Sequence, residues 1–129
     1  MTPEQIDRVE QLVRRISADD SFATAFYARL FAAAPETQAM FPDVDAQRGK
    51  LQEELETLVS LLLDLPRLEQ EAAALGVRHR SYGVRARHFR VARDAMDAAL
   101  TDTLGDDFTP ADREAWRRAY GLITELMQS

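Results

Sequence analysis

The sequence predicts an all-α fold in a single domain. Apolar residues recur at intervals of three and four along most of the chain, which is the period of a helix with one buried face. No segment shows the sustained alternation of polar and β-branched residues that is typical of a strand. The helical segments are separated by short stretches that contain proline or glycine, and 129 residues is the length of one domain.

The composition narrows the classes of function. Hydrophobic residues make up 46% of the chain, which is typical of a globular protein, and the net charge of −6 argues against general nucleic-acid binding. The chain has no cysteine, so any metal must be bound by nitrogen or oxygen ligands. The acidic N-terminus does not resemble a signal peptide, and the longest purely apolar run, Leu61 to Leu63, is too short to cross a membrane. We therefore expect a cytoplasmic protein without membrane or nucleic-acid partners.

Two helices are predicted in the N-terminal third of the chain. Thr2, Pro3 and Gln5 have the spacing of a capping box with proline in the first turn. The apolar face of this first helix is formed by Ile6, Val9, Val13 and Ile16. Asp19 or Asp20 can cap the second helix, whose buried face is rich in aromatic residues: Phe22, Phe26, Tyr27, Leu30 and Phe31. A buried Tyr27 hydroxyl needs a partner or a function.

The next segment contains a short turn followed by a longer helix. Pro35 is predicted to open a turn over residues 36–40, and Phe41 then stands at a corner before Pro42. Asp45 can start the following helix, which Leu65 and Pro66 are expected to end. One broad face of that helix carries Gln47, Leu51, Leu55, Leu58, Val59 and Leu62, with Lys50 near its rim. On spacing alone, Gln47 and Lys50 are best interpreted as solvated side chains.

Three more helices follow, each with a recognisable end. The first carries Leu68, Ala72, Leu75 and His79 on one face and is expected to stop at Gly83. The second runs from about residue 87 to 104, buries Phe89, Ala92, Met96, Ala99 and Leu100, and ends at Gly105. Thr109 and Pro110 start the last helix, which is filled by Trp116, Tyr120, Ile123 and Met127.

His79 is the best candidate for a metal ligand in this chain, because a neutral imidazole is a good ligand for iron. The alternative is a packed or half-exposed histidine without a ligand, and spacing alone favours that alternative.

Three groups of residues together resemble the globin family, in particular bacterial single-domain globins and the haem domain of flavohaemoglobins. The first group is the segment 26–31 with Pro35-Glu36 and Met40-Phe41-Pro42, and the second is Gln47-Arg48-Gly49-Lys50-Leu51. The third is the segment 75–84, with the segments 104–110 and 115–121 downstream. The resemblance covers nearly the whole chain in the correct order. It implies a globin domain over residues 1–129, with about seven or eight helices that enclose a haem pocket.

The resemblance also implies a role for each residue of the pocket. His79 corresponds to the proximal iron ligand, Tyr27 and Gln47 to the two polar distal positions, and Phe41 to the corner phenylalanine that packs on the haem. Further haem-contacting positions are Lys50, which matches a position that reaches a propionate, Leu51 on the distal side, and Leu75, Val84 and Phe89 on the proximal side. His88 has no ligand role in this pattern, and we expect it at the surface.

These roles imply a haem b protein with a five-coordinate iron that reversibly binds O₂, NO or CO, for oxygen binding, transport or sensing. If His79 binds iron through Nε2, its Nδ1–H requires an acceptor, for which a backbone carbonyl one turn earlier is suitable. Tyr27 and Gln47 can both donate hydrogen bonds to a bound gas. The alternatives are a nitric oxide dioxygenase that works with a separate reductase, and a helical interaction domain that does not bind haem.

The sequence departs from the flavohaemoglobin pattern in two ways. Phe89 stands where those proteins have a proximal tyrosine, and the sequence stops at Ser129 before the position of their proximal glutamate and of their reductase region. We therefore do not expect the strong proximal electron donation of peroxidase-like chemistry. A basic cluster around the proximal corner comprises Arg78, Arg80, Arg85, Arg87, Arg90 and Arg93. One interpretation is that this cluster pairs with haem propionates or docks an acidic electron donor. We favour the other, a solvated face with local salt bridges.

Overall fold

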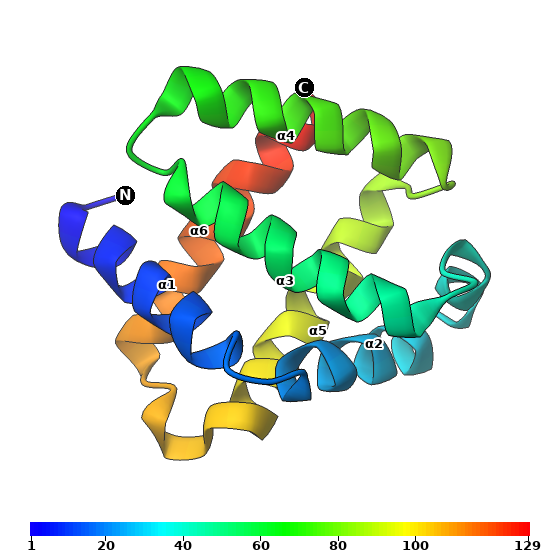
Figure 1. Ribbon diagram of the computed structural model, residues 1–129, viewed down its shortest axis with the longest axis horizontal. Coiled ribbons are helices and arrows are strands. Elements are labelled where there is room, and N and C mark those ends of the chain that lie inside the picture. Colours follow the sequence, from blue (N-terminus) through cyan, green and yellow to red (C-terminus); the bar gives the residue numbers. More distant parts are fainter.

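The structure, a computed structural model that describes residues 1–129, consists only of helices and their connections, as predicted (Figure 1). The α-helices are α1 (Pro3–Ile16), α2 (Ser21–Ala33), α3 (Val44–Ser60), α4 (Leu65–Ser81), α5 (Ala86–Leu104) and α6 (Pro110–Gln128). Two short 3₁₀ helices, η1 (Pro35–Met40) and η2 (Gly105–Asp107), lie between them. None of the helices combines the length and the apolar character that a membrane crossing requires.

The predicted starts of the first and last helices are confirmed. At α1, the Thr2 hydroxyl accepts a hydrogen bond from the Gln5 amide at 3.1 Å, and the Gln5 side chain accepts one from the Thr2 amide at 3.0 Å. Thr109 and Asp112 form the same reciprocal pair at α6. These bonds satisfy backbone amides that have no partner within the helix, and they fix where each helix begins.

Two predicted boundaries in the middle of the chain are wrong. Asp43, rather than Asp45, caps α3 by accepting a hydrogen bond from the Ala46 amide at 3.1 Å. Leu65 and Pro66 begin α4 instead of ending α3, which stops at Ser60. Proline suits the first turn of a helix because its missing amide hydrogen is not needed there, and the preceding Asp64 provides the cap.

Helix α3 crosses the front of the molecule in Figure 1, with α5 and α6 behind it. Helix α2 packs on α5, α1 packs on α6 and α3, and α4 packs on α6. The last contact is very close, because a Cβ atom added to Gly76 of α4 would lie 2.0 Å from the Met127 carbonyl oxygen of α6. Only glycine fits at this crossing.

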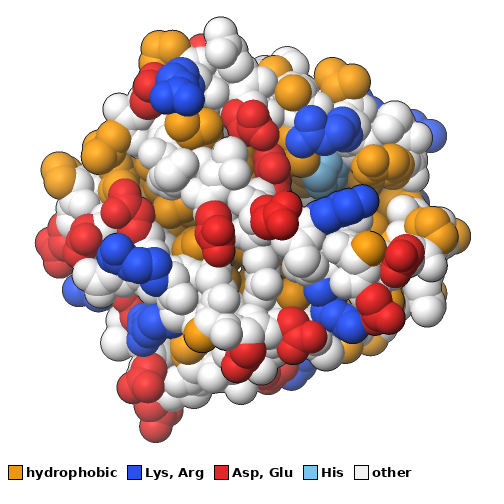
Figure 2. All heavy atoms as spheres, viewed as in Figure 1, with side chains coloured by type: hydrophobic (Ala, Val, Ile, Leu, Met, Phe, Trp, Pro, Cys, Tyr) orange, Lys and Arg blue, Asp and Glu red, His pale blue; other side chains and the backbone are white.

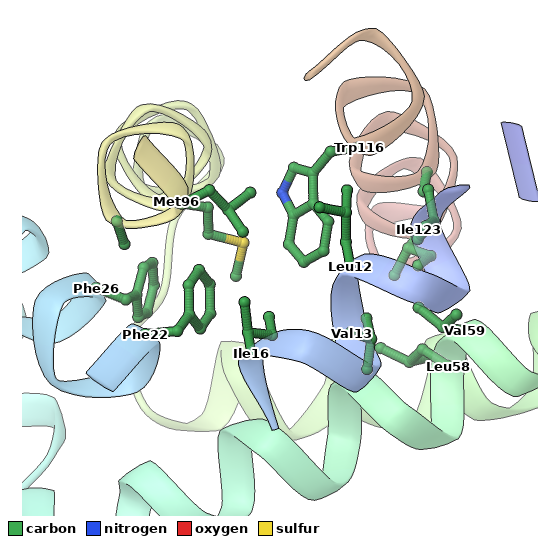
Figure 3. Close-up of a cluster of buried hydrophobic side chains, with 14 of the residues drawn as sticks. Leu12, Val13, Ile16, Phe22, Phe26, Leu58, Val59, Met96, Trp116 and Ile123 are labelled. Atoms are coloured by element: carbon green, nitrogen blue, oxygen red, sulfur yellow. The ribbon is translucent and has the colours of Figure 1, made fainter. Parts of the chain in front are cut away.

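The main hydrophobic core lies between α1, α2, α5 and α6 and extends to α3 (Figure 3). Phe22 is fully buried, stacks on Phe26 with ring centroids 6.4 Å apart, and contacts the edge of Trp116 at 6.1 Å. Leu12 and Ile16 of α1 complete this core. Leu58 and Val59, near the end of α3, belong to this core, whereas residues near the start of α3 form one wall of a pocket.

Candidate functional site

A pocket of about 460 Å³ lies between α2, α3, α4, α5 and α6, and 21 of the 31 residues that line it are hydrophobic. Its volume is within the range of small-molecule and cofactor sites. All of the predicted site residues line it: Tyr27, Phe41, Gln47, Lys50, Leu51, Leu75, His79, Val84 and Phe89. In Figure 2, histidine atoms are visible in an opening between basic side chains. The pocket is therefore mostly apolar, with basic (Lys50, Arg78) and acidic (Glu53, Glu54) side chains among its lining residues.

His79 is held in one orientation by its own helix and by α5. Its Nδ1 lies 2.9 Å from the Leu75 carbonyl oxygen, one turn earlier in α4. Because a carbonyl oxygen only accepts hydrogen bonds, Nδ1 carries the proton, and Nε2 has a free electron pair. The Phe89 ring stacks on the imidazole, with ring centroids 6.2 Å apart and an interplanar angle of 22°. The predicted hydrogen bond to a backbone carbonyl is confirmed.

The surroundings of His79 favour the neutral imidazole. Burial lowers the pKa of His79 below its ordinary value of 6.5, the bond to Leu75 opposes this shift, and the positive charge of Arg78 adds to it. A lowered pKa keeps Nε2 unprotonated at neutral pH, which is the form that binds a metal.

Tyr27 lies on the opposite side of the pocket, within a cluster of aromatic rings. Its side chain is buried, and its ring contacts those of Phe26, Phe31 and Phe41 at centroid distances of 5.0, 5.8 and 5.4 Å. Burial raises the pKa of Tyr27 to about 12, although hydrogen bonding with the Gln47 side chain partly opposes the rise. The hydroxyl therefore keeps its proton at neutral pH and can act as a donor.

The first turns of α3 supply the remaining residues of this wall. Gln47 and Leu51 are half-buried one turn apart, and Lys50 is exposed at the rim. Gln47 thus approaches Tyr27 from a second helix, which places two neutral donors side by side. Residue spacing alone gave no sign of this pairing, which only the family resemblance implied; in the structure, α2 and α3 pack directly on each other.

Phe89 and Tyr120 occupy the wall behind His79. The Tyr120 hydroxyl donates a hydrogen bond to the Phe89 carbonyl oxygen at 2.5 Å, and burial raises the pKa of Tyr120. This tyrosine was predicted only as a core residue. Its hydroxyl is bound to the backbone of α5. The acceptor of the His79 hydrogen bond is the Leu75 carbonyl, which is a neutral group rather than a carboxylate.

His88 is buried, contrary to our expectation of a surface position. It is 5% exposed and lines the pocket. Its Nδ1 accepts a hydrogen bond from the Arg85 amide at 2.8 Å, and its Nε2 lies 3.4 Å from a carboxylate oxygen of Glu36. The imidazole therefore caps α5 and connects it to η1. Periodicity missed this role because capping by a histidine three residues into a helix has no distinctive pattern.

A pair of carboxyl groups, Glu54 and Glu71, was also missed. Glu54 lines the pocket, and burial raises its pKa, as do a hydrogen bond and electrostatic repulsion from Glu71. The Arg78 guanidinium, 3.9 Å away, lowers the pKa in part. The two glutamates come from different helices, so no sequence spacing brings them together.

The basic cluster forms local ion pairs, as the favoured interpretation predicted. Arg78 pairs with Glu54, Arg87 with Glu36 at 3.8 Å, and Arg93 with Asp94 at 3.2 Å. Arg80 donates to the Met127 carbonyl oxygen at 3.0 Å. Arg85 and Arg90 are exposed and form no ion pair; the charge of this region is only partly neutralised.

Comparison with known proteins identifies the family of the chain. The family model described as Globin matches residues 24–127, which is most of the chain. The chain belongs to the globin family. Among curated globin relatives, it is 30% identical over 134 residues to a flavohemoprotein of Deinococcus radiodurans, and 27% identical over 131 residues to one of Rhodopirellula baltica. These alignments cover 98% of the chain but only 33% and 32% of the relatives, so the chain spans about a third of their length.

The globin fold is also found in a solved structure. An engineered carbene transferase, described as a putative nitric oxide dioxygenase from Rhodothermus marinus, superimposes with a TM-score of 0.86. The superposition covers 98% of this chain and 90% of that one, at 22% sequence identity. At this identity the likeness concerns the fold, which is the globin fold that the resemblance implied.

Proposed function

We propose that this globin binds haem b and that His79 is the proximal ligand of the iron. The observation that carries the proposal is the free Nε2 of a neutral, oriented imidazole inside an apolar pocket. The residues present fit a haem: the pocket is large and mostly hydrophobic. Of its two imidazoles, His88 has partners at both nitrogens, whereas His79 is hydrogen-bonded at Nδ1 to the Leu75 carbonyl, as iron-binding histidines commonly are, and has Nε2 free.

The other residues of the pocket would hold the ring and its acidic groups. Phe41 and Leu51 provide apolar contacts on the distal side, and Leu75, Val84 and Phe89 provide them on the proximal side. Lys50 is exposed at the rim, where its ammonium group can pair with a propionate in water.

We propose reversible binding of O₂ and other diatomic gases as the function. Haem, when bound, supplies the iron on which such a gas is held. Tyr27 and Gln47 donate hydrogen bonds on that side, and because burial raises the pKa of Tyr27 to about 12, its hydroxyl remains a donor throughout the physiological range. The Gln47 amide does not close the site as a histidine would, so the gas position stays open.

The proximal side supports gas binding over peroxidase-like chemistry. His79 donates to a neutral carbonyl, and the Tyr120 hydroxyl is bound to the Phe89 carbonyl, so neither contact gives the imidazole the anionic character that a carboxylate would. A moderately basic imidazole favours holding O₂ rather than breaking its bond.

Haem titration and stopped-flow kinetics test this function. We expect the purified protein to take up one haem per chain, to form an O₂ complex in the ferrous state, and to release O₂ slowly without rapid oxidation. A ferrous protein that forms no O₂ complex, or that oxidises as soon as O₂ is added, would contradict the proposal.

Nitric oxide dioxygenation, with a separate reductase, is the second candidate. The similarity to flavohemoproteins favours it, and the same two distal donors would serve it. We expect at most slow nitrate formation from NO, because the proximal contacts are neutral. Sustained turnover with a reductase, at a rate far above that of oxidation in O₂ alone, would instead make this the main function.

A further inference from the structure

A second cleft, of about 510 Å³, lies on the outside of the proximal wall between α5 and α6. Three arginines line it, Arg90 and Arg93 from α5 and Arg117 from α6, together with Gly121 of α6. A Cβ atom added to Gly121 would meet no atom within 4 Å, so the glycine leaves open space there. We refer to this site as the arginine cleft.

The arginine cleft and the pocket that contains His79 lie on opposite sides of one wall. Phe89, Tyr120 and Thr124 line both the cleft and the pocket, so a single layer of side chains separates them. The Phe89 ring, which stacks on the His79 imidazole, belongs to this layer. The cleft is thus the place on the α5–α6 surface where an external molecule comes within one aromatic ring of the proposed iron ligand.

The charge of this region is opposite to that of the whole protein. Residues 72–93 contain six arginines and no aspartate or glutamate, whereas the chain carries a net charge of −6. Within the cleft, Arg93 pairs with Asp94 and Arg117 with Asp97, but Arg90 has no acidic partner within 4 Å, and the exposed Arg85 one turn earlier is also unpaired. The surface therefore attracts an acidic molecule.

The polar contacts in the cleft fit an acidic protein better than a small anion. The Thr124 hydroxyl already donates to the Tyr120 carbonyl at 2.8 Å, and the Gln128 amide donates to the Thr124 carbonyl at 3.0 Å. The remaining donors are the guanidinium groups of Arg90, Arg93 and Arg117, all on exposed side chains. Exposed charge of one sign is typical of transient interfaces, in which electrostatic attraction sets the rate of encounter.

We propose that the arginine cleft is the docking surface for an acidic one-electron donor protein, and this inference rests on the proposed haem function. In the step that it serves, the reduced donor loses one electron and the ferric iron gains it, so no proton or other reactant is required. Arg90 and Arg93 orient the donor, and Phe89 lies between it and His79.

Binding and reduction by an acidic plant-type [2Fe–2S] ferredoxin test the inference. The ferredoxin is titrated at low ionic strength into the haem protein and, in parallel, into the haem-free protein, and the rate of haem reduction is measured by stopped flow. We expect Arg90→Glu/Arg93→Glu to weaken binding and slow reduction at least tenfold, with the difference disappearing in 0.5 M salt. Gly121→Leu, which fills the cleft without changing its charge, is expected to slow reduction severalfold.

The matched control is Arg14→Glu/Arg67→Glu, which makes the same change in total charge on exposed residues of α1 and α4 outside the cleft. We expect less than a twofold effect. Equal effects of the two double variants, or a wild-type protein that does not bind the ferredoxin, would overturn the inference. Failure of the haem function would be seen separately, as a missing haem spectrum in a protein whose haem-free form still binds ferredoxin.

Discussion

The two walls of the pocket are built in different ways. On the proximal wall, the orientation of His79 is fixed by a backbone hydrogen bond within α4 and by the stacked Phe89 ring of α5. On the distal wall, Tyr27 is buried among aromatic rings of α2 and the ring of Phe41, which follows η1, whereas Gln47 is half-buried in the first turn of α3. The His79 side chain is thus held by two contacts, whereas the distal wall combines a buried donor with a half-buried one, which we expect to be less firmly held.

This difference suggests a division of roles. The proximal wall would determine whether the haem is held at all, because it provides the ligand. The distal wall would determine how long a gas remains, because each of its donors contributes a hydrogen bond of about 1 kcal/mol. Changes to the proximal wall should therefore have all-or-none effects, and changes to the distal wall should have graded ones.

The largest effect is expected for His79→Leu, which removes the ligand and keeps an apolar side chain of similar size. We expect the Soret band of stoichiometric haem binding to be lost, with at least a hundredfold weaker haem affinity measured by titration. His88→Gln is the matched control, because His88 lines the same pocket but its nitrogens are turned to Arg85 and Glu36. Normal haem uptake by His79→Leu, or its loss in His88→Gln, would contradict the assignment of the ligand.

Gly76→Ala should disturb the proximal wall through the backbone. Its Cβ atom would lie 2.0 Å from the Met127 carbonyl oxygen, so α4 and α6 must move apart. We expect the free energy of unfolding, measured by urea denaturation, to fall by about 3 kcal/mol or more. The control is Gly121→Ala, whose Cβ meets nothing within 4 Å and which should stabilise α6 by up to about 1 kcal/mol. Similar effects of the two substitutions would show that the close crossing is unimportant.

Tyr27→Phe should produce a graded change on the distal wall. Loss of its hydroxyl is expected to speed O₂ dissociation about tenfold, since one well-placed hydrogen bond is worth roughly 1 to 1.5 kcal/mol. Gln47→Leu should speed it about threefold, because the half-exposed amide is less firmly held. Stopped-flow measurement of O₂ release compares the two. A larger effect of Gln47→Leu would reverse our interpretation of which donor is more firmly held.

The smallest effect is expected for Glu54→Gln, and it depends on pH. The pKa of Glu54 is raised in the folded protein above the ordinary glutamate pKa of 4.5, which applies to the unfolded chain. The folded protein therefore holds this proton more tightly than the unfolded chain does. The corresponding stability is present below pH 4.5 and is lost as the pH rises through the folded pKa. Glutamine cannot lose that proton, so Glu54→Gln should be more stable at pH 7.5 by less than about 1 kcal/mol, because the group is partly exposed.

Urea denaturation at pH 4.0 and pH 7.5 checks this prediction. The two proteins should have nearly the same free energy of unfolding at pH 4.0. A less stable Glu54→Gln at pH 7.5 would mean that the ion pair with Arg78 outweighs the cost of burying the charge.

Most of the helices could be predicted from local signals in the sequence, and part of the pocket lining from the family resemblance. Capping residues and apolar periodicity gave the starts of α1 and α6 and the buried faces, and the order of family motifs placed His79, Tyr27 and Gln47 around one cavity. The pairing of Glu54 with Glu71 joins two helices through side-chain contacts that no spacing records. The burial of His88 likewise depends on a hydrogen bond to its own helix end and on the position of η1.

The visible absorption spectrum of the haem-loaded ferrous protein, without added gas, tests the central claim most directly. If His79 is the only protein ligand and Gln47 and Tyr27 leave the distal position open, the spectrum should be that of a five-coordinate iron, and it should convert to a stable O₂ form when O₂ is added. A six-coordinate spectrum in the absence of gas would contradict this view, because a side chain of the protein would then occupy the position that we assign to the gas.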